Sequence, residues 1–237
     1  MARNRWFQFK QFRIEQQRAA MKVGTDGVLL GAWCNVDNVS RLLDIGTGTG
    51  LIALMAAQRS AAAVDAIELN EEAAADARFN FLQSPWSNRI TLYCIDFLHY
   101  CQQTNNRYDL IVSNPPFFVR SLQPDNEGVA MARHNDTLPF DRLLAGVARL
   151  LMPNGRLAVI IPADSFDHFR EEARLAGLYL SQQCMVYPKP GKRAKRVMLE
   201  FSMQATYPVK QEITIHTEEN RYTLEYSSLT QPFYLDK

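Results

Sequence analysis

The stretch LLDIGTGTG (residues 42–50) joins a short apolar run to an aspartate and three glycines at alternate positions. Such a pattern predicts a buried strand that turns sharply into a helix and brings its backbone close to a ligand. The glycine spacing G-x-G-x-G is tighter than the G-x-G-x-x-G of dinucleotide-binding loops. Asp44, which precedes the glycines, would repel a phosphate but could hold a cation. We therefore expect a ligand that carries a positively charged group at this turn.

Strand and helix patterns alternate on both sides of the turn. Apolar runs predict strands over 41–46, 63–69, 89–96, 108–114, 156–162, 179–188 and 196–204. Periodic or capped stretches predict helices over 50–60, 70–84, 140–151 and 164–176. Strands that alternate with helices require crossover connections, so we expect an α/β fold with a mostly parallel sheet. No helix separates the last two strands, which should therefore pair antiparallel.

The length of 237 residues suits one domain covering 1–237. Within it we expect a basic N-terminal segment (1–40), a core sheet (41–204) and a C-terminal hairpin (205–237) that turns at Glu219-Asn220. The segment 118–139 shows no regular period. An irregular stretch of this length inside a compact domain is usually functional or disordered.

Composition excludes several classes of protein. Hydrophobic residues make up 47% and charged residues 22%, as in an ordinary globular protein. No apolar run reaches the length of a membrane span, and the start MARNRWFQFK lacks the apolar core of a secretory signal. Neither the four cysteines nor the four histidines show metal-ligand spacing. We expect a cytoplasmic protein with reduced thiols and with neither a metal site nor a membrane partner.

The net charge of +1 is unevenly distributed. Residues 1–22 carry six basic side chains and one acidic side chain, and residues 189–196 (KPGKRAKR) carry five basic side chains and no acidic one. The rest of the chain is acidic overall. Concentrated positive charge suits the phosphates of a polyanion. We predict RNA contacts from Lys10, Arg13, Lys22, Lys192, Arg193, Lys195 and Arg196.

Acidic residues end the next two predicted strands. Glu68 could accept hydrogen bonds from both hydroxyls of a ribose. Asp96 could accept from an adenine amino group, while the ring of Phe97 covers the base. In open α/β sheets ligands bind at the carboxyl ends of the strands, where these residues should lie together. The row suits an adenosine with a cationic tail and no phosphate, which describes S-adenosyl-L-methionine.

In order and spacing, LLDIGTGTG, IEL (67–69), CID (94–96) and SNPPF (113–117) resemble the motifs of class I methyltransferases over residues 20–204. The resemblance implies a Rossmann-like, seven-stranded sheet with an antiparallel last strand and helices on both faces. It also implies that the cofactor is bound by residues of these motifs and of the segment MKVGTDGVLLGAW (21–33). Those residues are Thr25, Asp26, Asp44, Gly46, Gly48, Gly50, Glu68, Leu69, Asp96, Phe97 and Asn114.

The sequence N-P-P-F resembles the [ND]-P-P-[YFW] motif of enzymes that methylate a planar exocyclic nitrogen. Such a nitrogen is a poor nucleophile because its lone pair is delocalised. Hydrogen bonds to the side-chain oxygen of Asn114 and the carbonyl of Pro115 would favour a pyramidal nitrogen and aim its lone pair. Pro116 would stiffen the turn, and Phe117 would stack on the planar target. We predict these four residues as the catalytic group.

Three substrates remain compatible with this motif. The whole chain resembles the small bacterial enzymes that methylate N6 of adenine-37, next to the anticodon of a valine tRNA. This resemblance implies roles in RNA binding, tRNA processing and tRNA modification, and His134 in ARHND could contact the substrate. One alternative is a ribosomal RNA guanine-N2 methyltransferase, which usually has a second domain. Another is a release-factor glutamine N5-methyltransferase, which typically has N-P-P-Y and a helical N-terminal domain.

Overall fold

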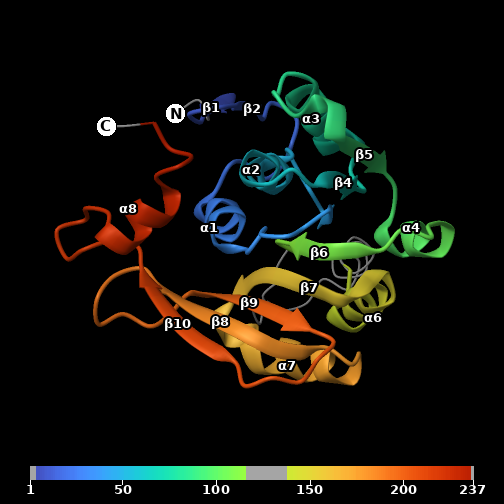
Figure 1. Ribbon diagram of the computed structural model, residues 1–237. Coiled ribbons are helices and arrows are strands. Elements are labelled where there is room, and N and C mark those ends of the chain that lie inside the picture. Colours follow the sequence, from blue (N-terminus) through green and yellow to red (C-terminus); the bar gives the residue numbers. More distant parts are fainter. Residues whose placement is uncertain (1–3, 116–137, 236–237) are drawn as a thin grey trace, which may run out of the picture.

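The computed structural model describes residues 4–115 and 138–235 and is built around an eight-stranded mixed sheet (Figure 1). Its strands are β3 (Arg41–Ile45), β4 (Ala63–Glu68), β5 (Ile90–Cys94), β6 (Tyr108–Ser113), β7 (Leu151–Pro162), β8 (Tyr179–Tyr187), β9 (Arg196–Ser202) and β10 (Val209–Thr214). Their spatial order is β10-β8-β9-β7-β6-β3-β4-β5. The chain runs outward from β3 to β5 and then returns to the other side of β3 with β6. Such a reversal opens a crevice at the carboxyl ends of the two central strands.

Helices cover both faces of this sheet (Figure 1). They are α1 (Thr25–Trp33), α2 (Leu51–Arg59), α3 (Glu71–Leu82), α4 (Phe97–Gln103), α6 (Phe140–Leu150), α7 (Phe166–Leu175) and α8 (Leu224–Thr230), with short 3₁₀ turns at Ser87–Arg89 and Ala163–Ser165. One layer holds α1, α2, α3 and α8, and the other holds α4, α6 and α7. In β7, Ala158 and Ile160 pack in the first layer, whereas Leu157 and Val159 pack in the second. Burial on both faces explains the continuous apolar runs of the sequence.

The reversed strand is β9, which pairs antiparallel with both β7 and β8. The other neighbours in the sheet pair parallel. The connection 188–195 between β8 and β9 is too short for a crossover, so these two strands form a hairpin. The expected α/β class with a mostly parallel sheet is confirmed. The expected count of seven strands is wrong, because β10 adds an eighth strand parallel to β8.

The C-terminal hairpin expected over 205–237 is also corrected. Residues 209–214 join the edge of the main sheet, where the long strand β8 offers six register pairs. The local turn supplies a single antiparallel bridge, between His216 and Tyr222, with Asn220 in the left-handed region at φ 63°. The run after this turn is the helix α8, whose N-cap Thr223 accepts a hydrogen bond from the amide of Tyr226. A long-range strand partner thus replaced the local one.

The N-terminus forms a two-stranded antiparallel ribbon, β1 (Trp6–Gln8) and β2 (Arg13–Glu15), which the sequence pattern does not predict. The C-terminal tail lies beside it in Figure 1. The ring of Phe9 stacks on Tyr234 with centroids 5.9 Å apart, and the amide of Lys10 donates to the carbonyl of Phe233. The two ends of the chain therefore pack together over the layer of α1 and α2.

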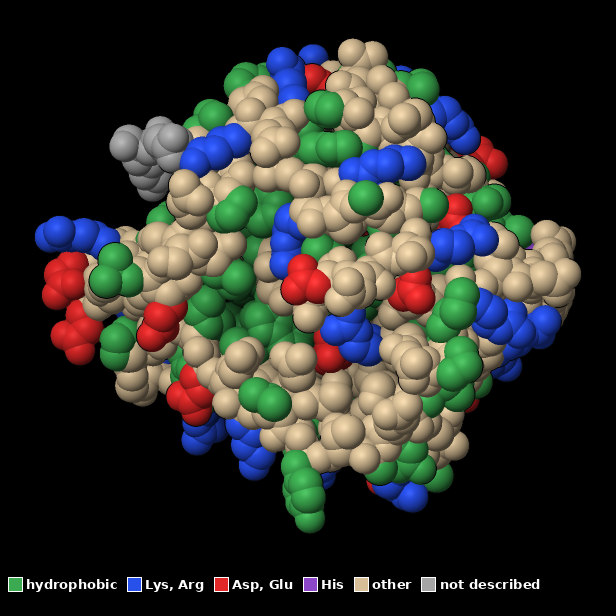
Figure 2. Space-filling model, in the orientation of Figure 1, with side chains coloured by type: hydrophobic (Ala, Val, Ile, Leu, Met, Phe, Trp, Pro, Cys, Tyr) green, Lys and Arg blue, Asp and Glu red, His purple; other side chains and the backbone are tan. Residues whose placement is uncertain are grey.

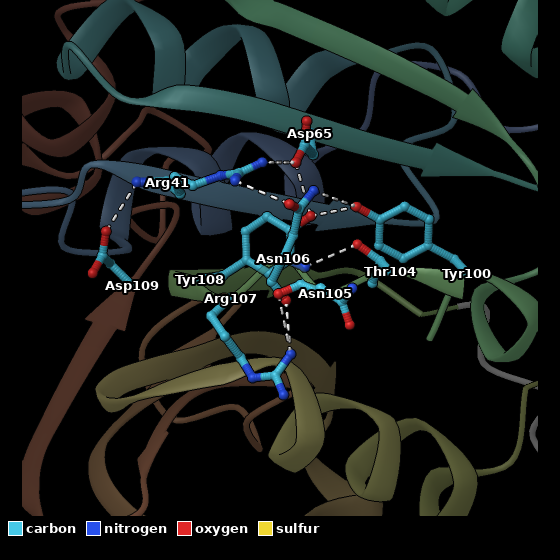
Figure 3. A network of polar contacts seen from close by, with 9 residues as sticks. All are labelled: Arg41, Asp65, Tyr100, Thr104, Asn105, Asn106, Arg107, Tyr108 and Asp109. Carbon is cyan, nitrogen blue, oxygen red and sulfur yellow. Dashed lines mark hydrogen bonds and ion pairs between the residues drawn. The ribbon is translucent and has the colours of Figure 1, made fainter. Parts of the chain in front are cut away.

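The amino-terminal edge of the sheet carries a polar network (Figure 3). Asp65, which is 5% exposed, accepts from Arg41 Nη2 at 2.9 Å and from the hydroxyl of Tyr108 at 2.8 Å. The Tyr100 and Tyr108 hydroxyls share a further hydrogen bond. Burial raises the pKa of Tyr108, so its hydroxyl stays protonated and keeps donating. The buried carboxylate of Asp65 is thus paired with Arg41, and the network stabilises the sheet at the end away from the crevice.

Charged side chains on the face shown in Figure 2 are of both signs and are interspersed with apolar ones. Cys34, Cys101 and Cys184 are buried, as expected of small apolar residues, whereas Cys94 at the end of the edge strand β5 is exposed. Within 4–115 and 138–235, no group of three or more His, Cys, Asp or Glu side chains is arranged to hold a metal ion. No helix of these two ranges is long and apolar enough to cross a membrane.

Candidate active site

A cavity of about 960 Å³ opens at the carboxyl-terminal edge of the sheet. Parallel strands end at the same edge, so residues distant in the sequence meet in its wall. Gly46 follows β3, Glu68 ends β4, Asp96 follows β5 and Asn114 follows β6, and all four line the cavity. The structure therefore brings predicted cofactor residues from three strand ends into one space with the predicted catalytic amide.

The glycine loop forms the floor beside β3. Gly48 has a φ of 58°, and a Cβ built on it would meet no other atom within 4 Å, so its backbone faces open space. Gly50 has a φ of 85°, but a Cβ there would lie 2.4 Å from the ring of Phe81 on α3. Gly46 and Gly48 line the cavity, whereas Gly50 is not among its lining residues and serves close packing of the loop against α3.

Asp44 lies buried beneath this loop and is not among the residues that line the cavity. Its Oδ2 accepts from the Thr47 hydroxyl at 2.6 Å and from the Ala53 amide at 3.1 Å, which ties β3 to the loop and to α2. Its Oδ1 is buried without a hydrogen-bond partner among the described residues. The pKa of Asp44 is raised to about 7, chiefly by burial; the two hydrogen bonds oppose this rise, and the nearby Glu68 adds to it. A cation near Oδ1 would favour the ionised form.

Glu68 is fixed by two backbone amides. Its Oε2 accepts from Gly48 at 2.8 Å and its Oε1 accepts from Asn70 at 2.9 Å. The first bond joins the end of β4 to the glycine loop, and the second starts the turn into α3. Each carboxylate oxygen has a further lone pair, so Glu68 can still accept two hydroxyl donors from a ligand in the cavity.

Asp96 and Phe97 begin α4. Oδ1 of Asp96 accepts from the amide of His99 at 2.9 Å, which makes Asp96 the N-cap of the helix. Phe97 is 4% exposed, and its ring packs against Gly146 of α6, where a Cβ would lie only 2.6 Å away. Both residues line the cavity, as does Leu69, which is 57% exposed. Capping and ligand contact are thus compatible at Asp96.

The end of β6 places the predicted catalytic turn. Ser113 is buried, and its hydroxyl donates to the carbonyl of Ile45 at 3.0 Å, which ties β6 to the end of β3. Asn114 and Pro115 then enter the cavity wall. Pro116, Phe117 and His134 lie outside the described residues. Ser113 was not predicted as a site residue, although its place directly before Asn114 points to this anchoring role.

Two further parts of the wall were missed by sequence reasoning. One is the N-terminal segment Ala19, Ala20 and Met21, and the other runs from Leu138 and Pro139 into the first turn of α6. The second begins with the last two residues of the irregular segment 118–139, and that overlap was the available signal. Met21 begins the segment 21–33 that was expected at the cofactor, whereas nothing distinguishes Ala19 and Ala20 from an ordinary linker.

Thr25 and Asp26 begin α1 and are not among the residues that line the cavity. Asp26 Oδ2 accepts from Arg196 Nε at 2.7 Å. The ion pair joins the start of α1 to the start of β9. It involves one residue predicted for the cofactor and one predicted for RNA; neither lines the cavity, and their side chains are 29% and 35% exposed.

The remaining predicted RNA contacts differ in their surroundings. Lys192, Arg193 and Lys195 are exposed in the loop 188–195. In the ribbon, the Arg13 guanidinium lies 4.3 Å from the ring centroid of Trp6 and pairs with Glu15. Lys10 is half-buried beside this ribbon, and Lys22 Nζ donates to the carbonyl of Gln16. Of the basic residues predicted to contact RNA, those of the loop 188–195 are therefore the most accessible to a ligand.

The groups in and beneath the cavity wall match the three parts of S-adenosylmethionine. Gly46 and Gly48 leave space against the backbone, Glu68 offers two acceptors, and the orphaned Oδ1 of Asp44 supplies negative charge beneath the loop. Apolar side chains such as Phe97 line the part of the cavity next to Asp96. A cationic amino-acid tail, a ribose and an adenine each find a matching group.

Solved structures show the same fold. A predicted O-methyltransferase from Agrobacterium tumefaciens superimposes with a TM-score of 0.63 at 20% identity, covering 88% of this chain and 96% of that chain. A TehB-like SAM-dependent methyltransferase from Corynebacterium glutamicum does so with a TM-score of 0.51 at 20% identity, covering 76% of this chain and 89% of that chain. At these identities the likeness establishes the class I methyltransferase fold alone.

Relatives in sequence are more informative. Residues 24–168 match the family described as the methyltransferase small domain. A protein named tRNA1(Val) (adenine(37)-N6)-methyltransferase from Bacteroides fragilis is 47% identical over 231 residues, covering 97% of this chain and 98% of its own length. A protein of the same name from Histophilus somni is 38% identical over 238 residues and is covered completely. The chain belongs to the methyltransferase small domain family, in the group that these relatives form, and its cofactor is S-adenosylmethionine.

Proposed function

We propose that this protein transfers a methyl group from S-adenosylmethionine to N6 of an adenine in tRNA, namely adenine-37 of tRNA1(Val). Relatives that are similar over almost their whole length carry this activity in their names. The observation that carries the proposal is the position of Asn114 and Pro115 in the wall of the cofactor cavity. The acceptor groups for a target nitrogen and the groups for the cofactor therefore face the same space.

The chemistry needs acceptors more than it needs a nucleophilic side chain. When bound, S-adenosylmethionine supplies a methyl group on a positively charged sulfur. The side-chain oxygen of Asn114 and the carbonyl of Pro115 accept hydrogen bonds from the two N–H groups of the target amine. These bonds draw the nitrogen toward a pyramidal shape and orient its lone pair. The Ser113 hydroxyl, bonded to Ile45, holds this turn to the strand that leads into the glycine loop.

An adenine in a folded RNA reaches such a cavity only after it leaves its stack. A base in an anticodon loop is already unpaired, so little free energy is needed to turn it out. We assign its phosphates to the exposed Lys192, Arg193 and Lys195, with Lys10, Arg13 and Lys22 as further contacts from the N-terminal segment. Phe117 and Pro116, the rest of the motif, complete the proposed catalytic group. Because the substrate is tRNA, we propose that the protein acts in the cytoplasm as one methyltransferase domain.

The two alternative substrates find less support. Most described residues belong to the methyltransferase sheet and its helices, the N-terminal ribbon, or the C-terminal helix. The relatives of similar length are named for adenine in tRNA.

The proposal is tested with purified protein, methyl-labelled cofactor, and total RNA and protein from cells that lack the gene. We expect the label in small RNA, and digestion of this RNA should release labelled N6-methyladenosine. In a second assay, transcribed tRNA1(Val) should accept the label, and the same transcript with guanine in place of adenine-37 should not. Label in large ribosomal RNA as N2-methylguanosine, or in a nuclease-resistant protein band, would contradict the proposed substrate.

A further inference from the structure

The wall segment Ala19–Met21 belongs to a strap, residues 16–23, that crosses from the N-terminal ribbon to α1. The strap has no helix or strand of its own. It is closed on itself by Gln16, which is 4% exposed and whose Oε1 accepts from the amide of Val23 at 2.7 Å. Met21 is 62% exposed and still lines the cavity, so the strap forms an edge of the cavity mouth.

Two buried polar residues of α3 hold this strap. Asp76 is 4% exposed, and its Oδ2 accepts from two successive amides, Arg18 at 2.8 Å and Ala19 at 2.9 Å. The residues Ala73, Asp76 and Asn80 lie on one face of the helix by their spacing, and Ala73 itself lines the cavity. Asp76 thus fixes the backbone immediately before the part of the strap that forms the wall.

Asn80 connects the strap to the glycine loop. It is 2% exposed, and its Oδ1 accepts from the amide of Glu15 at 2.8 Å. Its Nδ2 donates to the carbonyls of Glu15 and Thr49, both at 2.9 Å. One side chain therefore joins Glu15, the residue directly before the strap, to the glycine loop at Thr49. Buried amides with every group bonded specify one arrangement of the segments they join.

We propose that Asp76 and Asn80 are positioning residues that fix the strap 16–23 against the glycine loop, so that Ala19, Ala20 and Met21 form a set wall of the cofactor cavity. The proposal rests on the cofactor assignment and not on the choice of RNA. A mobile strap would have to be ordered each time the cofactor binds, and this cost would weaken binding. The hydrogen bonds to α3 order the strap when the protein folds, so that cofactor binding does not have to order it.

The test compares Asp76→Ala with Asp109→Ala. Asp109 offers a matched control, because its Oδ2 also accepts from two successive amides, Ser40 and Arg41, both at 2.9 Å. It lies at the amino-terminal edge of the sheet, away from the cavity (Figure 3). Titration of the cofactor-free proteins with S-adenosylmethionine gives the Kd, and hydrogen exchange reports on the amides of Arg18 and Ala19.

For Asp76→Ala we expect the two amides to exchange faster and the Kd to rise about tenfold, equivalent to about 1.4 kcal/mol. The kcat at saturating cofactor should stay within about threefold, because the catalytic turn is untouched. Asp76→Asn, which keeps an oxygen acceptor, should recover most of the affinity. Asp109→Ala should leave the Kd within about twofold.

The proposal is overturned if both amides stay protected in Asp76→Ala, or if they are released without any change in Kd. An equal loss of affinity in Asp109→Ala would also overturn it, because the effect would then be general destabilisation. If Asp76→Ala does not fold, Asp76→Asn and Asn80→Ala are compared in the same way. The titration contains no RNA, so a wrong RNA substrate would leave its result unchanged.

Discussion

At the scale of single residues, the proposed mechanism relies on oxygen atoms that accept hydrogen bonds and not on a nucleophilic side chain. Asn114 lines the cavity, Glu68 has two carboxylate oxygens there, and Asp44 holds one oxygen unbonded beneath the loop. Each oxygen is placed by a strand end, so its position depends on the sheet. Loss of one oxygen should therefore remove one function and leave the others.

Asn114→Ala should lower kcat by about 10²–10³ and leave the cofactor Kd within about twofold, because only the acceptor for the target amine is lost. Rapid-quench assays with tRNA and calorimetry with the cofactor measure the two quantities. Asn105→Ala, at an exposed position at the other edge of the sheet, serves as the control and should match the wild type. Normal turnover of Asn114→Ala would remove that amide from the mechanism.

Asp44 should make cofactor binding depend on pH. Its pKa is raised from 3.8 to about 7 by burial, so the carboxyl is protonated at pH 6 and ionised at pH 8. A cationic ligand group binds the ionised form, so affinity should rise about tenfold from pH 6 to pH 8. Asp44→Asn should bind weakly and show only the titration of the ligand itself. Equal pH profiles for the two proteins would contradict the prediction.

The same raised pKa acts on stability. Between pH 3.8 and about 7 the folded protein holds a proton on Asp44 that the unfolded chain has released. The free energy of unfolding of the cofactor-free protein should therefore decrease as pH rises through this window, relative to Asp44→Asn. Above about pH 7 the folded and unfolded states bind equal numbers of protons at Asp44. The difference in the free energy of unfolding between the wild type and Asp44→Asn should then become constant.

At the scale of elements, the β8–β9 hairpin exposes a group of positive charges in its loop. Its loop 188–195 keeps Lys192, Arg193 and Lys195 exposed, while Arg196 at the start of β9 pairs with Asp26. Gly191, with a φ of 66°, allows the tight turn. The hairpin is fixed by seven register pairs between its strands, so the loop starts from a rigid base.

Replacement of Lys192, Arg193 and Lys195 with alanine should weaken tRNA binding and leave cofactor affinity unchanged. The slope of log K against log salt concentration should fall by roughly two, since each phosphate contact contributes about 0.7–0.9. Fluorescence anisotropy at several salt concentrations measures this slope. The control removes the same charge from the exposed Arg107, Arg170 and Lys210 and should keep the wild-type slope. Identical slopes for the two triple variants would exclude the loop from the RNA interface.

At the scale of the whole molecule, the two ends of the chain close the layer of α1 and α2. Phe9 and Phe233 are buried, with 0% and 1% exposed, and Tyr234 stacks on Phe9. The ribbon continues directly into the strap that lines the cavity. Packing at the C-terminus therefore supports the segment that shapes the site.

Phe233→Ala should lower the free energy of unfolding by about 3–5 kcal/mol, because it removes a fully buried ring. Urea unfolding of the cofactor-free protein measures the loss. Tyr207→Ala, at a position that is 100% exposed, should change stability by less than about 0.5 kcal/mol. A similar small change for Phe233→Ala would mean that the C-terminal tail contributes little to the fold.

From the sequence alone we predicted seven of the eight strands of the sheet, the helices α2, α3, α6 and α7, the reversed β9, and the four motifs that meet at one edge. These follow from local patterns, because buried strands need continuous apolar runs, turns need glycine, and parallel strands share an edge. Three contacts became evident only in the folded protein: β10 joins β8, Gly50 packs on Phe81, and Asp26 pairs with Arg196. The tertiary structure alone placed Ala19–Met21 in the cavity through Asp76 and Asn80. Each of these depends on a partner distant in the sequence, and no local pattern encodes which of several possible partners a segment contacts.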